Sequence, residues 1–199
     1  MERRVIQMVV NKELMDVWNK LVPHKVSVLI WRIWQNKIPS RENLVKRGIL
    51  PQSQVLCPYG CSCEENIAHI FFECPAAIVV WNEVYRWLGF WYVSHNSAVQ
   101  NFMQFAGMSC GGRVNKERLM VIWFACIWTI WKQRNDKVFK TSEQSNRNGV
   151  EAIQILSWSW IKLKVVMFEG STVVGMKEGV SAVNELKENS LQKVDGDGA

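Results

Sequence analysis

The sequence has little that would place the chain in or across a membrane. Its main apolar stretch, Leu119–Trp131, spans thirteen residues, which make about 20 Å of helix, whereas the hydrocarbon core of a bilayer is about 30 Å thick. The chain opens Met1-Glu2-Arg3-Arg4, and no apolar signal segment follows. We therefore expect a nuclear or cytoplasmic protein that is not secreted and that buries residues 119–131 as a central helix.

Motifs of several enzyme classes are missing as well. A polymerase palm holds two metal ions about 4 Å apart with clustered aspartates, typically in a Y-x-D-D turn, and no such turn occurs here. An RNase H site also needs several carboxylates around paired metals, but the acidic residues of this chain are scattered. No P-loop pattern is present either. We therefore expect the chain on its own to have no catalytic activity.

Cysteine, in contrast, is concentrated in one short segment. Four of the six cysteines and one of the three histidines lie between Cys57 and Cys74, in the pattern C-x3-C-x7-H-x4-C. Structural zinc takes four thiolate or imidazole ligands in a tetrahedron and favours two short-range pairs joined by a longer spacer. Gly60 can adopt a positive φ, which allows a tight turn between the first two cysteines. We therefore predict one closed zinc site, with Cys57, Cys61, His69 and Cys74 as ligands.

Alternatives exist for this cysteine cluster. Cys63 could replace Cys61 as a ligand or be a spare thiol at the rim of the site; we favour Cys61, because a C-x-C pair brings both sulfurs to a metal less easily alongside Cys57. The cysteines could instead form disulfides or be scattered core residues. Disulfides need an oxidising compartment, so the missing signal segment favours zinc.

The spacing of His69 and Cys74 constrains the local backbone. Five residues of a continuous α-helix would leave the two side chains about 140° apart. We therefore expect a short helix that carries His69 and ends before Cys74. Pro75 fits this arrangement, because proline suits the first turn of a helix and disfavours a helical residue before it. Cys74 would then lie at a helix start, where the helix dipole favours a thiolate.

Apolar residues at helical spacing predict a mainly α fold. A strand over residues 26–34 is the alternative for the first of these segments. The expected helices are one opened by Pro23 and ended by Pro39, one over 41–47 capped by Ser40 and ended by Gly48, one over 77–88 ended by Gly89, one capped by Ser97 and reaching Ala106, one over 119–131, and one following Gly149 with Ile153, Leu156, Trp160, Leu163 and Met167 on one face.

Composition and hydrophobic pattern divide the chain into four expected regions. Residues 1–22 form a loosely helical lead-in, 23–112 hold the zinc-binding domain, and 113–168 form a helical extension packed on it. Residues 169–199 read as an acidic, disordered tail, because hydrophobic period and bulk fade there. Gly107, Gly111 and Gly112 predict a flexible break before the central helix, whose polar end, residues 132–137, we expect to leave the core.

Basic residues flank the cysteine segment on both sides. The net charge is +6, which suggests a polyanionic partner. Residues 1–56 and 113–168 each carry ten basic and four acidic side chains, whereas residues 57–112 carry one and four. A solvated helix face explains these charges as well as a phosphate-binding patch does. The candidate nucleic-acid-binding residues are Lys25, Arg32, Lys37, Arg41, Lys46 and Arg47.

Tryptophan is abundant, with eleven residues in the chain. Core packing explains most of them, whereas stacking of nucleic-acid bases on an exposed subset is the less favoured interpretation. The tryptophans that we expect in the interior are Trp31, Trp34, Trp81, Trp123, Trp128, Trp131 and Trp160.

Several stretches of the sequence occur in a characteristic order and spacing. They are Trp18–Val26, Trp31-Arg32-Ile33, Ile38–Ile49, Cys57–Cys74 with Glu65 and His69-Ile70-Phe71, Trp81, and Ile127–Phe139. Taken together, they resemble the zinc-binding domain downstream of the reverse transcriptase in plant non-LTR (LINE-type) retrotransposons. The resemblance covers roughly residues 12–140 and leaves Cys63 as an extra cysteine; nothing beyond Phe168 resembles the family.

The resemblance implies a nuclear setting in a plant and a role with nucleic acid during retrotransposition. It also implies zinc ligation by Cys57, Cys61, His69 and Cys74, the same set that the spacing predicts. We therefore expect a non-catalytic zinc-binding domain that contacts RNA or DNA through its basic flanks. The alternative is a zinc-stabilised fragment of a degenerate retroelement that binds a polymerase or another protein and has no nucleic-acid affinity of its own.

Overall fold

The computed structural model describes residues 17–91, 95–108, 112–140 and 149–169, and the side chains of these residues except 112–115 and 163–169. Most of the lead-in (1–16) and of the expected tail (170–199) lie outside the described residues. The elements are α2 (His24–Trp34), α3 (Arg41–Lys46), the short 3-10 helix η1 (Gln52–Gln54), the π-helix η2 (His69–Glu73), α4 (Pro75–Leu88), α5 (Ala98–Gly107), α6 (Gly112–Phe139) and α7 (Gly149–Glu169).

The prediction of a mainly helical fold is confirmed. Within the described ranges, β pairing consists of one isolated bridge between Leu56 and Glu64. The alternative of a strand over residues 26–34 is wrong, because α2 occupies that segment. No helix in the described part of the chain is long and apolar enough to span a bilayer.

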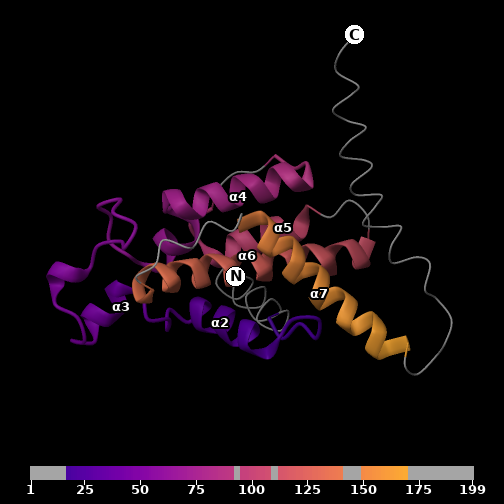
Figure 1. Cartoon of the computed structure of the whole chain (residues 1–199), viewed down its shortest axis with the longest axis horizontal. Coiled ribbons are helices and arrows are strands. Elements are labelled where there is room, and N and C mark those ends of the chain that lie inside the picture. Colours follow the sequence, from indigo (N-terminus) through magenta and orange to yellow (C-terminus); the bar gives the residue numbers. More distant parts are fainter. Residues whose placement is uncertain (1–16, 92–94, 109–111, 141–148, 170–199) are drawn as a thin grey trace, which may run out of the picture.

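Helix α6 lies at the centre of the fold (Figure 1). It packs against α2, η2, α4, α5 and α7, and residues 119–127 are all buried. The prediction of a buried central helix is therefore confirmed, and Cys126 is a packing residue with no exposed surface. The helix extends beyond residues 119–131 at both ends, where lysine, arginine, glutamate and glutamine favour helix.

Aromatic side chains fill the space between α4, α5 and α6. Phe102 meets Trp123 edge to face at a centroid distance of 5.0 Å, and Phe105 contacts both Trp81 and Tyr85. Such pairs add about 0.5–1.5 kcal/mol each to the free energy of unfolding beyond the area that they bury. The three helices therefore form one core beside the cysteine segment.

The seven tryptophans predicted to lie in the interior differ in how deeply they are buried. Three of the seven are buried, and four are partly buried against the core. The buried ones are Trp81, Trp123 and Trp160, and the partly buried ones are Trp31, Trp34, Trp128 and Trp131.

Most predicted helix ends are confirmed, but the end of α2 is not. This helix ends at Trp34 rather than at Pro39. Asn36 adopts a left-handed conformation with φ 51°, and the Lys37 N–H donates to the Arg32 carbonyl at 2.7 Å. This closing turn satisfies a terminal carbonyl of the helix before proline is reached.

Capping residues place the next helices as expected. Ser40 Oγ accepts a hydrogen bond from the Asn43 N–H at 3.2 Å, and Ser97 caps α5 in the same way. Gly89 ends α4 in the left-handed region, with φ 71°. Of the glycines expected to break the chain, Gly107 closes α5 and Gly112 opens α6, whereas Gly111 lies outside the described residues.

Candidate metal centre

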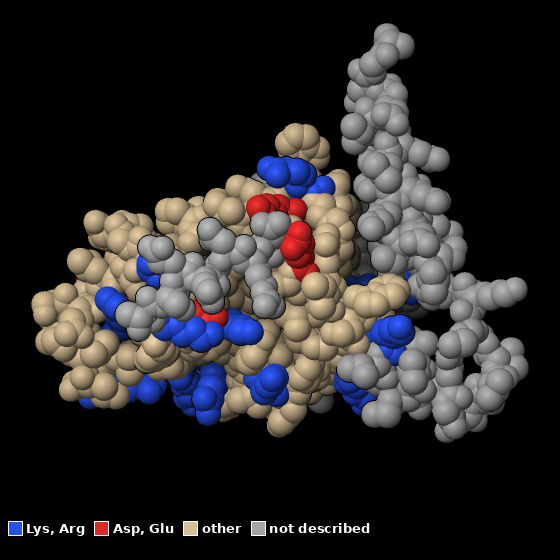
Figure 2. Space-filling view, viewed as in Figure 1, with Lys and Arg blue, Asp and Glu red and all other residues tan. Residues whose placement is uncertain are grey.

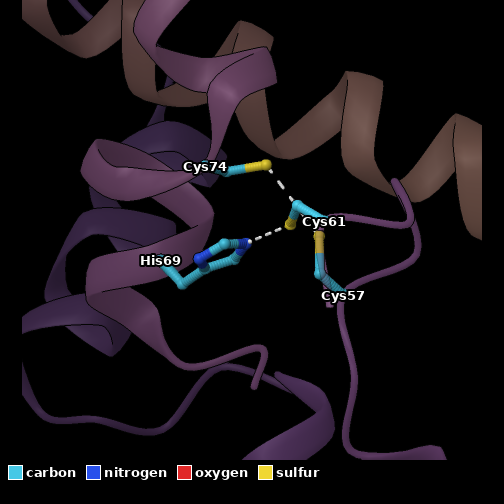
Figure 3. Close-up of side chains that lie close together, drawn as sticks. All are labelled: Cys57, Cys61, His69 and Cys74. Carbon is cyan, nitrogen blue, oxygen red and sulfur yellow. Dashed lines mark hydrogen bonds between the residues drawn. The ribbon is translucent and has the colours of Figure 1, made fainter. Parts of the chain in front are cut away.

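The structure brings Cys57, Cys61, His69 and Cys74 together (Figure 3). Their ligand atoms all lie within 4.8 Å of one another. Three of the four residues are buried, and Cys61 is half-buried. The four side chains come from two local structures, a hairpin loop and a helical turn, which face each other across the site.

The hairpin loop positions the first two cysteines. The Cys57 N–H donates to the Cys63 carbonyl at 2.8 Å, and the Gly60 N–H donates to the Cys57 carbonyl at 3.1 Å. Gly60 has φ 80°, the positive value predicted for it. Ser62 also has a positive φ, 58°. The resulting reversal directs Cys57 and Cys61 to the same side of the loop.

The helical turn positions His69 and Cys74. Asn66 Oδ1 accepts the His69 N–H at 2.8 Å and so caps the start of the turn. The turn then widens into the π-helix, in which the Cys74 N–H donates to the His69 carbonyl at 2.8 Å. The prediction of a helix that ends before Cys74 is confirmed, since Cys74 has extended dihedral angles and Pro75 opens α4. The π-type bonding could not be predicted from the spacing.

The donors present fit a single zinc ion. With Zn–S bonds of about 2.3 Å and Zn–N bonds of about 2.0 Å, tetrahedral geometry places two sulfurs about 3.8 Å apart and a sulfur and a nitrogen about 3.5 Å apart. The Cys57 and Cys74 sulfurs are 3.9 Å apart, and Cys61 Sγ lies 3.1 Å from His69 Nε2. The two separations lie within about 0.4 Å of these values, so the donors are close enough to share one ion.

Burial sets the protonation of the site in the absence of metal. Burial raises the pKa of Cys57 to about 12 and also raises the pKa of Cys74. Burial acts to raise the pKa of Cys61 too, but hydrogen bonds from Cys57 and from the Cys63 backbone lower it overall. Burial lowers the pKa of His69, so its imidazole is neutral and able to ligate. A divalent cation would displace the thiol protons.

The positions of the cysteine side chains decide between the alternatives of a Cys63 ligand, disulfides and the predicted cluster. Cys63 is exposed and lies outside the group, with its thiol donating to the Cys61 carbonyl at 3.4 Å. The cysteines of the described residues are all free, so none of them forms a disulfide. The structure therefore favours Cys61 over Cys63 as the fourth member of the cluster.

A buried ion pair next to the cluster was missed by sequence analysis. Glu65 and Arg134 are 1% and 4% exposed; Arg134 Nε donates to Glu65 Oε2 at 3.0 Å and its Nη2 to Oε1 at 2.5 Å. The expectation that all of residues 132–137 leave the core is therefore wrong for Arg134. The burial of Arg134 could have been predicted from its position in the sequence, because it continues the buried face of Trp123, Ile127 and Ile130 at helical spacing.

The six candidate nucleic-acid-binding residues do not form one patch of free cations. Lys25, Arg32 and Lys37 are exposed on or just after α2. Arg41 instead donates to the Leu56 carbonyl at 2.8 Å and so supports the hairpin loop. Lys46 pairs with Glu42 at 2.6 Å. The remaining residue, Arg47, is exposed after α3.

Two lysines of this set lie over tryptophan rings. Lys25 Nζ is 5.1 Å from the Trp128 ring centroid, and Lys37 Nζ is 5.5 Å from that of Trp31. In Figure 2, basic side chains lie along the lower edge of the molecule, where Figure 1 shows α2, and the acidic side chains visible in this view lie above that edge. The face of α2 therefore combines positive charge with aromatic surface.

A short glycine–serine pattern lies between α5 and α6. Residues Gly107-Met108-Ser109-Cys110-Gly111 spell G-x-S-x-G, the pattern of a nucleophile elbow. That elbow requires a strand before the serine, whereas here helix α5 precedes it. Ser109 itself lies outside the described residues. The structural context therefore does not support a hydrolase.

A comparison with known families agrees with the geometry. Residues 4–81 match the family model described as zinc-binding in reverse transcriptase, and this range contains all four clustered residues. The match covers less than half of the 199-residue chain, and the family in question is a zinc-binding part of reverse transcriptases rather than their catalytic polymerase domain. Zinc is the metal indicated by both the family and the Cys3His donor set. No curated protein and no solved structure matches the chain.

Proposed function

We propose that the chain is a non-catalytic zinc-binding module derived from a plant non-LTR retrotransposon reverse transcriptase, and that it acts in the nucleus or cytoplasm. The convergence of Cys57, Cys61, His69 and Cys74 carries this proposal. With four protein ligands the zinc site is closed, so the ion stabilises the fold and has no open position for a substrate. The family match over residues 4–81 supports an origin in a reverse transcriptase, and the sequence resemblance alone supports the plant non-LTR class.

We further propose that the module contacts RNA or DNA through the basic face of α2. Lys25, Arg32 and Lys37 are exposed there, and none of them pairs with a carboxylate within the described residues. Lysine and arginine that neutralise phosphates release counterions, which makes binding depend steeply on salt. Trp31 and Trp128 beside these cations add aromatic surface that bases could stack on.

A binding titration with single-stranded RNA tests this proposal. The triple variant Lys25→Glu/Arg32→Glu/Lys37→Glu should bind more weakly than the wild type, and the slope of log affinity against log salt should fall by up to about three. Arg41 is left unchanged, because it supports the hairpin loop.

A control for total charge is available on other helices. Arg86, Lys116 and Lys162 are exposed on α4, α6 and α7, so reversing these three changes the net charge by the same amount. This control variant should retain most of the affinity. Equal losses in both triple variants would show a non-specific charge effect and remove α2 from the proposal. Duplex DNA in the same assay reports which nucleic acid is preferred.

A protein-binding role is the second candidate. Ile155 is 68% exposed and Trp158 is 39% exposed on α7, and such apolar exposure is typical of an interface with another protein. If the wild type fails to bind single-stranded RNA or DNA even at low salt, this candidate replaces the first. Micromolar or tighter, salt-sensitive binding is expected only for the nucleic-acid module.

A further inference from the structure

The stretch Ile127–Phe139 lies outside the segment that matches the zinc-binding family, yet it touches the metal centre. The family match ends at residue 81. Helix α6 nevertheless contacts the π-helix that carries His69, and its residue Arg134 reaches Glu65, 69 positions earlier in the chain. The contacts suggest a role for α6 beyond filling the core.

Glu65 stands at the junction between the two halves of the metal centre. On its N-terminal side, its N–H donates to the Val55 carbonyl at 2.9 Å and closes the base of the hairpin loop. On its C-terminal side, the chain passes through Asn66, which caps the turn of His69. Glu65 therefore lies directly between the hairpin loop and the helical turn.

The Glu65 carboxylate is held from two directions. Arg134 donates two hydrogen bonds to it in a bidentate arrangement, and the Arg41 N–H at the start of α3 donates to Oε1 at 3.0 Å. A bidentate pair fixes the plane of a carboxylate as well as its position. The pair is buried, so water does not compete for it.

The second half of the site rests on the same stretch of α6. The Trp131 ring lies 6.3 Å from the ring of Phe71, which belongs to the π-helix between His69 and Cys74. Arg134 packs its guanidinium over Trp131 at 5.3 Å. One turn of α6 thus supports the hairpin loop through Arg134 and the helical turn through Trp131.

We propose that Arg134 is a positioning residue of the zinc site, and that the functional zinc-binding unit extends through α6 rather than ending at residue 81. Arg134 acts through Glu65, which fixes the distance between the pair Cys57/Cys61 and the pair His69/Cys74. Partners that bond a metal ligand directly typically contribute about 10–100-fold to metal affinity; Arg134 acts one contact further out, so we expect the lower end of that range, about tenfold. This inference rests on the zinc site of the proposed function.

The test measures zinc in the full-length chain, by competition with a chromophoric chelator and by the rate of zinc release. Arg134→Met should lower zinc affinity about tenfold and speed zinc release. Glu65→Gln should do the same, and the double variant should be no worse than either single variant, because both changes break one interaction. Ile130→Ala is the matched control, since Ile130 is buried on the same helix. It should lower stability, and because folding and zinc binding are coupled, it should lower the zinc affinity only by the factor that its measured loss of stability accounts for.

The outcomes separate this inference from the proposed function. If the wild type does not bind zinc, both fail. If the wild type binds zinc and Arg134→Met binds it equally well, or loses no more affinity than its own loss of stability accounts for, as in Ile130→Ala, only the positioning role is overturned. If Arg134→Met does not fold even with excess zinc, Arg134→Lys replaces it, because lysine keeps the charge but cannot form the bidentate pair. Unchanged zinc affinity in Arg134→Lys would then overturn the inference.

Discussion

Two cysteines that are two positions apart illustrate how position decides the role of a residue. Cys61 and Cys63 have the same chemistry, but the turn through Gly60 and Ser62 places only Cys61 beside His69. Cys63 is exposed and points its thiol at a backbone carbonyl. Residue identity and spacing therefore reduced the candidates for this ligand to Cys61 and Cys63, and the dihedral angles of the loop decide in favour of Cys61.

This contrast gives a paired prediction. Cys61→Ser should abolish stoichiometric zinc binding. It should also remove much of the helical circular dichroism signal, because zinc binding and folding are coupled in such domains. Cys63→Ser, the matched control, should retain both. The measurement is metal content by mass spectrometry under native conditions. Loss of zinc in Cys63→Ser with retention in Cys61→Ser would reverse the ligand assignment.

Protonation of the same thiols gives a second prediction. Since burial raises the pKa of Cys57 and Cys74, both carry protons in the metal-free chain at neutral pH, and zinc must displace them. Zinc affinity should therefore weaken as pH falls, by about tenfold per pH unit for each proton released. Zinc competition titrations at several pH values measure this slope. An affinity independent of pH between 6 and 8 would show that the thiols are not the ligands.

At the scale of elements, the packing of α5 on α6 depends on one buried polar contact as well as on aromatic rings. Trp123 Nε1 donates to Asn101 Oδ1 at 2.8 Å, and both residues are buried. A tryptophan N–H inside a core needs an acceptor, because a buried donor left without one costs free energy.

Removing this acceptor should destabilise the chain. Asn101→Ala should lower the free energy of unfolding by about 1–3 kcal/mol, since it leaves the Trp123 N–H unpaired. Gln100→Ala, on the exposed side of the same helix, should change it by less than about 0.5 kcal/mol. Urea denaturation of the zinc-loaded protein measures both. Equal effects would mean that the hydrogen bond contributes nothing specific.

The elements also show what sequence can predict and why. Caps and helix stops at Ser40, Gly89 and Pro75 were predictable, because they depend on local backbone chemistry. The early end of α2 was not predictable. It depends on the left-handed conformation of Asn36, and an asparagine can also adopt other backbone conformations. The pairing of Glu65 with Arg134 was also hidden, because it depends on how distant segments pack.

At the scale of the whole molecule, zinc and the helical core support each other. The hairpin loop and η2 with its C-cap Cys74 carry the four clustered residues, and η2 in turn packs on α4 and α6. Trp81 on α4 donates its indole N–H to the Phe71 carbonyl at 2.7 Å, which ties the π-helix to the aromatic core. The metal centre is therefore continuous with the core rather than an appendage to it.

Chelation of the metal should consequently be felt beyond the cluster. Excess chelator should reduce helical circular dichroism and lower the thermal unfolding midpoint, because the free energy of metal binding is part of the free energy of folding. Readdition of zinc should restore both, whereas magnesium, which prefers oxygen ligands, should not. A chain whose thermal midpoint is unaffected by chelation would contradict a structural role for zinc.

The distance along the chain between the parts of the metal centre has a consequence for biosynthesis. The four clustered residues lie within residues 57–74, whereas Arg134 is 69 positions beyond Glu65. Because a nascent chain emerges from the ribosome N-terminus first, the hairpin and the turn become available to capture zinc before α6 has been translated. If zinc is captured at that stage, the four local ligands hold it alone until α6 is made and Arg134 can pair with Glu65.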